Sequence, residues 1–223
     1  MAAGVKALGT WHATATIQEC REACGGQGYL RENRFAALKA DTDVDTTFEG
    51  DTTVLLQLDE PSLTAVIGGR VPTESGLSAY RAVDGPAAAA ALRTVVESAG
   101  VPVVLHSCAP EVPLQVVRDA GAAAVGLDLS LVKDLDPLGE AIEAGLGLFA
   151  GAALTLPPAG RAPAAKQIAE RVRTLWQRLG FPADRLPRQV VVTPACGLAG
   201  APDAYVRTVL KACREAGRRL ADV

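Results

Sequence analysis

Hydrophobic residues beyond about residue 54 fall into short runs that are separated by longer stretches with helical periodicity. Such runs, rich in Val, Leu, Ala and Gly, are typical of strands buried on both faces of a parallel sheet. Five runs are present: residues 54–58, 101–105, 123–129, 146–154 and 190–193. Their alternation with helices predicts an α/β fold. A closed barrel of this type has eight strands, so about five parallel strands predict a partial (β/α) barrel.

The stretches between these strands carry the start and stop signals of helices. Pro86 stands in the first turn of one predicted helix and Gly100 follows its end, a common arrangement because Pro fits the first turn and Gly the C-terminal cap. The predicted helices cover residues 86–99, 112–120, 137–144, 162–179 and 202–220.

The first 53 residues break this rhythm. They contain helix-like stretches at residues 5–24 and 31–40, a glycine-rich break at 25–28 and an acidic stretch at 41–53, but no strand-like run. The pattern therefore predicts two domains: a short helical segment over residues 1–53 and the partial barrel over residues 54–223.

The composition of the chain limits which binding partners and which cellular compartment are expected. The net charge of −3 and the pI near 5.5 argue against binding to nucleic acid or to an anionic membrane. The longest uncharged run, residues 144–160, contains Gly and Pro and is short for a membrane span. The start of the chain lacks the pattern of a signal peptide, and its five cysteines fit a reducing compartment, so a cytoplasmic location is predicted.

Candidate metal ligands follow two of the predicted strands. His106 and Cys108 come after the run at 101–105, and Cys196 comes after the run at 190–193. Chemistry collects at the carboxyl ends of strands in such barrels, and one imidazole with two thiols suits zinc. The alternative is that each thiol is a small buried hydrophobe. That interpretation is kept for the three remaining cysteines, Cys20, Cys24 and Cys213.

Three motifs at strand ends point to a family. The segments LQLDEP at 56–61, VVLHSC at 103–108 and VTPACGL at 192–198 resemble the catalytic domain of cobalamin-independent methionine synthase, over about residues 54–223. The resemblance implies zinc-dependent methyl transfer to the thiol of homocysteine, with a folate or a corrinoid protein as methyl donor. Zinc would bind and deprotonate that thiol.

The same resemblance implies roles for individual residues. The zinc ligands would be His106, Cys108, Asp128 and Cys196. Asp128 departs from longer family members, which carry Glu at this position. Asp59 would bind the ammonium group of the substrate by a charge-assisted hydrogen bond.

The first residues resemble a different family. The segments IQECREACGGQGYL at 17–30 and TTFEGDTTV at 46–54 are similar to acyl-CoA oxidases and dehydrogenases, over about residues 1–57. This resemblance implies a flavin near the glycine-rich segment and makes Glu49 the base that removes the α-proton of the thioester. In that family the flavin and acyl-CoA sites also need a helical and a β-domain, neither of which these residues match.

Three functions follow, and the chain is interpreted as a join of two fragments near residues 54–58. The first is zinc-dependent methionine synthesis, which an incomplete barrel would weaken or abolish. The alternative is a fragment of a flavin-dependent acyl-CoA oxidase or dehydrogenase with Glu49 as its base. The third is a zinc-binding or interaction module without catalysis.

Overall fold

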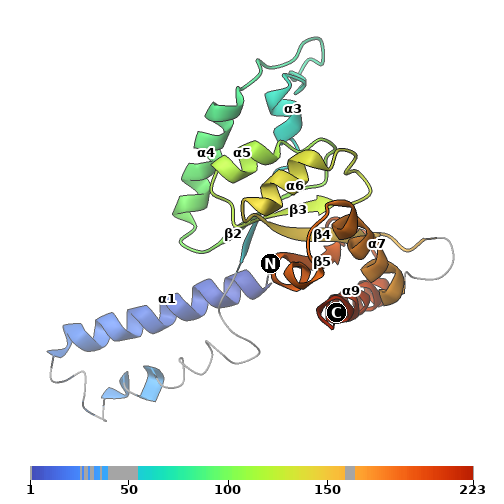
Figure 1. Ribbon diagram of the computed structural model, residues 1–223. Coiled ribbons are helices and arrows are strands. Elements are labelled where there is room, and N and C mark those ends of the chain that lie inside the picture. Colours follow the sequence, from blue (N-terminus) through green and yellow to red (C-terminus); the bar gives the residue numbers. More distant parts are fainter. Residues whose placement is uncertain are drawn as a thin grey trace. The chain divides into compact units, whose positions relative to one another are not determined.

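The computed structural model describes residues 2–25, 27, 30, 33–35, 37–39, 55–158 and 164–222 (Figure 1). The chain divides into two compact units, Met1–Leu56 and Gln57–Val223. The predicted domain boundary after residue 53 lies close to this division, and the predicted domain assignments themselves stay predictions.

The first unit is built on one long helix, α1 (Ala2–Ala23), which confirms the helix predicted at 5–24. The helix gives way to a turn at Gly25, whose φ of +53° lies in the left-handed region that glycine adopts at little cost. Beyond it, the amide of Leu38 donates a helical hydrogen bond to the carbonyl of Arg34 at 2.8 Å. Glu49 and the acidic stretch at 41–53 lie outside the described residues.

The second unit contains a five-stranded parallel sheet, as predicted. Its strands lie in chain order: β1 (Leu56–Asp59), β2 (Val103–Ser107), β3 (Ala124–Asp128), β4 (Gly147–Ala153) and β5 (Val190–Pro194). Sequential order is also the order of a (β/α) barrel, but here the barrel is not closed, and β1 and β5 form the two edges of the sheet. The fold class predicted from the sequence is confirmed.

Helices connect the strands and cover one face of the sheet. They are α3 (Leu63–Ile67), α4 (Gly85–Ser98), α5 (Leu114–Asp119), α6 (Asp136–Glu143), α7 (Ala165–Arg178), the 3-10 turn η3 (Ala183–Arg185), α8 (Leu186–Gln189) and α9 (Asp203–Ala221). In Figure 1, α4, α5 and α6 follow one another, and α7 packs against α9. Helix α4 begins where the carboxylate of Asp84 accepts a hydrogen bond from the amide of Ala87 at 2.8 Å, which satisfies a free amide of its first turn.

Strand register separates the two faces of the sheet. Leu105, Val125, Leu148 and Val190 are register partners across β2 to β5, and all four belong to or pack against the core formed with the helices. Successive side chains of a strand point to opposite faces. The next residues along, which are again register partners, therefore face away from the helices: His106, Gly126, Phe149 and Val191. Val191 is 47% exposed, so this second face is open at β5.

Candidate functional site

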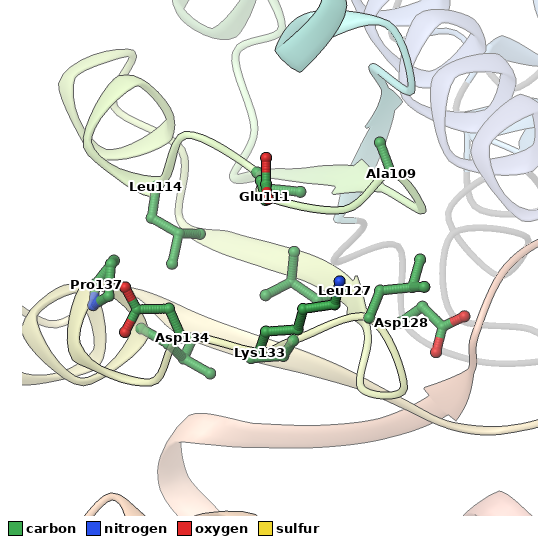
Figure 2. A pocket seen from close by; sticks show the side chains of 12 residues that line it. Ala109, Glu111, Leu114, Leu127, Asp128, Lys133, Asp134 and Pro137 are labelled. Atoms are coloured by element: carbon green, nitrogen blue, oxygen red, sulfur yellow. The ribbon is translucent and has the colours of Figure 1, made fainter.

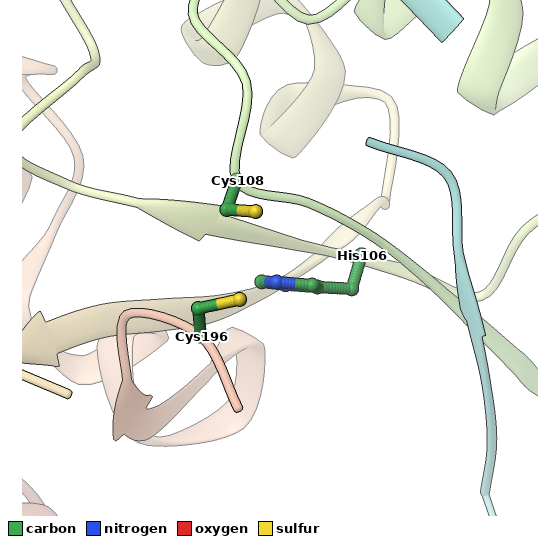
Figure 3. Close-up of side chains that lie close together, drawn as sticks. All are labelled: His106, Cys108 and Cys196. Atoms are coloured by element: carbon green, nitrogen blue, oxygen red, sulfur yellow. The ribbon is translucent and has the colours of Figure 1, made fainter. Parts of the chain in front are cut away.

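Three predicted ligand residues meet at the carboxyl end of the sheet. His106 lies within β2, Cys108 follows the end of β2, and Cys196 follows β5. One ligand atom from each lies within 4.8 Å of the others, and Figure 3 shows the imidazole and the two sulfur atoms pointing toward one another. The expected proximity of the three side chains is thus present, and their role as metal ligands stays a prediction.

A glycine on β3 makes room for the imidazole. Gly126 is the register partner of His106, and a Cβ built on Gly126 would lie 2.8 Å from His106 Nδ1. Real Cβ atoms essentially never approach a ring nitrogen so closely, so a larger residue would push the imidazole away. The ring can therefore lie across β3 toward Cys196 only because position 126 has no side chain.

A second glycine lets the end of β5 approach β4. A Cβ on Gly151 would lie 2.7 Å from the Cα of Ala195. The amide of Ala195 also donates to the carbonyl of Ala153 at 2.8 Å, so strand pairing continues beyond Pro194. The residue after Ala195 is Cys196, so this pairing positions Cys196 just beyond the ends of β4 and β5, with its thiol within reach of His106 and Cys108.

The three side chains differ in burial and hydrogen bonding. His106 is buried, Cys108 is half-buried and Cys196 is exposed. Among the described residues, His106 Nε2 has no hydrogen-bond partner. A buried nitrogen without a partner is costly, so this atom is suited to receive a ligand. The pKa of the Cys108 thiol is raised, first by its hydrogen bond with Cys196 and then by burial.

The two predicted carboxylates are engaged in local hydrogen bonds. Asp128 Oδ1 accepts hydrogen bonds from the amide of Ser130 at 2.8 Å and from its hydroxyl at 2.7 Å. Asp128 is not part of the three-residue group, and its role as a fourth ligand stays a prediction. Asp59 Oδ1 accepts a hydrogen bond from Gln57 Nε2 at 2.8 Å, and the Asp59 charge contributes to the raised pKa of Cys108.

The loops after β2 and β3 enclose a cavity that the sequence did not reveal. It has a volume of about 350 Å³ and an apolar floor that includes Leu114, Leu127 and Leu138. Figure 2 shows Glu111, Asp128, Lys133 and Asp134 around it. Glu111 has a φ of +57°, an uncommon conformation for a residue with a side chain. In the sequence, the charged residues Lys133 and Asp134 shortly after the strand predicted at 123–129 could have indicated a binding loop.

A larger, more open cavity of about 780 Å³ lies between the ends of β3 and β4 and helix α7. Asp128 lines both cavities, while Glu170 and Arg171 of α7 line the larger one. Arg171 donates to the carbonyl of Ala152 at 2.8 Å, which ties α7 to β4. Both cavities lie at the carboxyl edge of the sheet, where ligands commonly bind in parallel α/β folds.

Comparison with known proteins connects the start of the chain to one family. Residues 1–63 match the family model described as acyl-CoA oxidase, C-alpha1 domain. A protein of Arabidopsis thaliana named putative acyl-coenzyme A oxidase 3.2, peroxisomal, is 55% identical over 65 residues, which cover 29% of this chain and 10% of that protein. The resemblance predicted for residues 1–57 is thereby confirmed at the level of this domain.

Mammalian relatives show the same limited coverage. The acyl-coenzyme A oxidase-like protein of Mus musculus is 54% identical over 56 residues, covering 25% of this chain and 9% of that protein. Peroxisomal acyl-coenzyme A oxidase 3 of Homo sapiens is 51% identical over 57 residues, covering 26% of this chain and 8% of that protein. The chain therefore spans at most about a tenth of the length of these curated relatives.

The prediction of zinc-dependent methionine synthesis is wrong. The family that matches is that of acyl-CoA oxidases, which are oxidoreductases, and nothing in the comparisons supports a methionine synthase domain. The predicted S-methyltransferase activity, the zinc cofactor, and homocysteine with a folate or corrinoid methyl donor fall with it.

The physical reason for the error lies in how little the motifs specify. The H-x-C and C-G-L segments fix two thiols and one imidazole at strand ends, and this placement is independent of the reaction. Within the described residues, only His106, Cys108 and Cys196 form such a group, without the predicted Asp128. Asp59 is exposed and accepts a hydrogen bond from Gln57. Its surroundings therefore give no separate support for a site that binds the ammonium group of an amino acid.

The sequence also predicted that no segment spans a membrane. None of the helices in the described part of the chain is long and apolar enough to cross a membrane.

Proposed function

We propose that residues 1–63 serve as the C-alpha1 part of an acyl-CoA oxidase, and that the protein acts in the flavin-dependent oxidation of acyl-CoA thioesters. The observation that carries this proposal is the family match over residues 1–63, together with identities of 51–55% to named acyl-CoA oxidases. Because the chain spans only 8–10% of those proteins, the activity and the substrate are both inferred.

Glu49 is the proposed base for removal of the α-proton. A carboxylate can take this proton if it lies within hydrogen-bond reach of the thioester. Glu49 stands in the segment TTFEGDTTV, on which the resemblance depends, and lies outside the described residues.

The described part of residues 1–63 does not enclose a flavin by itself. It comprises helix α1, a few turn residues, strand β1 and the first residue of α3, and the two cavities described above are lined by residues from 109 onward. A flavin site must exclude water from the reacting carbon. The remaining walls of the site would therefore come from further polypeptide, in the same protein or in a partner.

A segment exchange tests the proposal. Residues 1–63 would replace the matching segment of the human peroxisomal acyl-coenzyme A oxidase 3, and FAD content and acyl-CoA oxidation would be measured. We expect the hybrid to retain FAD and activity, and Glu49→Gln to lower the rate by at least about a hundredfold. A folded, FAD-loaded hybrid with full activity after Glu49→Gln would contradict the role of this residue.

The location of the protein follows the same reasoning. The human and Arabidopsis relatives carry the word peroxisomal in their names, which favours a peroxisomal location over the predicted cytoplasm. Imaging of the tagged full chain in a eukaryotic cell would distinguish the two compartments.

A second candidate function belongs to the other unit and rests on the group formed by His106, Cys108 and Cys196. Their ligand atoms lie within 4.8 Å of one another, and His106 Nε2 is buried without a partner among the described residues. We infer that the group binds a divalent metal ion that accepts nitrogen and sulfur ligands. Titration with Co²⁺ tests this, because thiolate ligation produces a charge-transfer absorption that free Co²⁺ lacks.

A further inference from the structure

We propose that Cys108 and Cys196 form a redox-active pair, which a hydroperoxide oxidises to an intramolecular disulfide. The proposal is independent of acyl-CoA oxidation and does not require a bound metal. It concerns the thiols themselves, at the carboxyl ends of β2 and β5.

Proximity is the first argument. The two sulfur atoms belong to the group whose ligand atoms lie within 4.8 Å of one another, and Figure 3 shows them on facing loops. Cys196 is positioned by the pairing of Ala195 with Ala153, and Cys108 by the end of β2. A disulfide needs the sulfur atoms at about 2.05 Å, so a modest closing movement is required.

Freedom to make that movement is the second argument. Cys196 is exposed, and the next residue is Gly197, around which no other atom lies within 4 Å of a Cβ position. The chain next to Cys196 is therefore not packed against other residues at this position, which leaves space for the closing movement. Cys108 is half-buried and follows a strand whose residues are all buried, so it would be the fixed partner.

Exposure also assigns the order of the steps. The Cys196 sulfur, being exposed, attacks one oxygen of the hydroperoxide, so that an S–O bond forms and the O–O bond breaks. The alkoxide or hydroxide that leaves takes up the proton of the Cys196 thiol. The Cys108 sulfur then attacks the sulfenic acid at Cys196, forming the S–S bond and releasing the S–O oxygen as water with the Cys108 proton. Both sulfurs are oxidised and the peroxide is reduced.

The other thiols provide internal comparisons. Cys213 is buried in α9, and burial raises its pKa to about 11, so it is a poor nucleophile at neutral pH. Cys20 and Cys24 are exposed and lie in the other unit. They should react with peroxide as ordinary surface thiols. Their rate of oxidation is therefore the reference against which the rate of Cys108 and Cys196 is compared.

The test uses the full chain, freed of metal with a chelator and treated with hydrogen peroxide in slight excess over protein. Remaining thiols are blocked with an alkylating reagent before a trypsin digest without reductant. We expect a linked pair of peptides, residues 94–118 with 189–207, that separates on reduction. A variant with Ser at positions 20, 24 and 213 should give the same product, at a rate at least tenfold higher than in the urea-unfolded chain.

Single variants separate the two roles. Cys108→Ser should leave a sulfenic acid at Cys196 that a dimedone reagent traps, whereas Cys196→Ser should yield little trapped product at Cys108. Circular dichroism confirms that each variant is folded. The proposal is overturned if the linked peptides are absent from the folded protein, if Cys20, Cys24 and Cys213 link as readily, or if the unfolded chain reacts equally fast.

Discussion

Two glycines set the positions of the candidate site's side chains. Gly126 leaves the space that the His106 ring occupies, and Gly151 lets Ala195 approach β4 closely. Neither glycine has the positive φ that glycine alone adopts readily. Their function is to omit a side chain, and the sequence alone does not reveal that requirement.

Replacing Gly126 with Ala tests this role. The added methyl group would have to displace the imidazole, so we expect a loss of about 1–3 kcal/mol in the free energy of unfolding, typical of overpacking. Co²⁺ affinity should fall at least tenfold. Gly139→Ala in α6 is the matched control, because its Cβ would lie at an ordinary 3.6 Å from Leu179, and Ala favours helices. Equal Co²⁺ affinity in wild type and Gly126→Ala would contradict this account.

Single replacements of the three grouped residues test metal binding. Cys108→Ser and Cys196→Ser should each remove the thiolate-to-cobalt absorption or reduce Co²⁺ affinity at least tenfold, because each removes a charged ligand. Asp128→Ala should have a smaller effect, since Asp128 lies outside the group. The control is Cys213→Ser. Cys213 is buried in α9 and is not part of the group, so this variant should leave the titration unchanged. Unaltered cobalt spectra in both cysteine variants would rule out the site.

At the level of elements, sequence patterning located every strand but misplaced some ends. The run at 101–105 corresponds to β2, which extends over Val103–Ser107. Hydrophobicity ends the strand too early, because His106 and Ser107 are polar yet buried within it. The short helix α3 (Leu63–Ile67) was not predicted. Five residues carry too little periodicity to identify a helix.

The candidate site shows the same division between what could and could not be predicted. Parallel strands of one sheet end at one edge, so the strand assignments placed His106, Cys108 and Cys196 at that edge. Strands β3 and β4 lie between β2 and β5, and neighbouring strands are about 4.8 Å apart. The approach of the three side chains to within 4.8 Å of one another therefore also depends on the path of the sheet and of the loop after β5, which the sequence pattern does not specify. The cavity beside β2 and β3 did not follow from the strand assignments either. It depends on the paths of the loops at 109–112 and 131–134, including the left-handed backbone of Glu111, and hydrophobic periodicity carries no information about such paths.

Helix α9 gives a pH prediction for stability. Burial raises the pKa of Cys213 to about 11, above the ordinary thiol value that it regains on unfolding. The unfolded chain therefore ionises this thiol first as the pH rises. Its contribution to stability is intact below the unfolded pKa and is lost progressively as the pH approaches the folded value of about 11.

Urea unfolding between pH 8 and 11 would measure this effect. The free energy of unfolding should fall more steeply with pH in the wild type than in Cys213→Ala, which cannot ionise at this position. Tyr205 stays in both proteins. Its pKa is raised by burial and by the charge of Cys213, so part of its own pH response should weaken in the variant. Parallel curves for the two proteins would refute the buried-thiol explanation.

For the whole molecule, the family match and the candidate site lie in different parts of the chain. The acyl-CoA oxidase match covers residues 1–63 and thus reaches β1 (Leu56–Asp59), whereas strands β2 to β5, the two cavities and the group of His106, Cys108 and Cys196 lie from residue 103 onward. A function inferred from the first part therefore leaves the second unexplained. The metal and redox properties proposed for the second part can be tested independently.

Deleting residues 1–50 tests that independence. The second unit has a continuous core of its own, which includes Leu105, Val125, Leu148, Ile168 and Val209. Each large buried side chain contributes about 1.5–3 kcal/mol through burial. We therefore expect the shortened chain to unfold cooperatively and to bind Co²⁺ with unchanged affinity. Its product with peroxide should again link residues 94–118 to 189–207.

The exposed edge of the sheet sets the condition for that experiment. Leu55, just before β1, and Leu56, the first residue of β1, are 49% and 40% exposed, and an uncovered hydrophobic edge strand promotes association between chains. The shortened chain should therefore be compared with a variant carrying Leu55→Lys, which should reduce aggregation without changing Co²⁺ affinity, because residue 55 lies before the sheet begins. If both shortened proteins are unfolded by circular dichroism, the second unit depends on the first. If both are folded but no longer bind Co²⁺, the first unit contributes to the metal site.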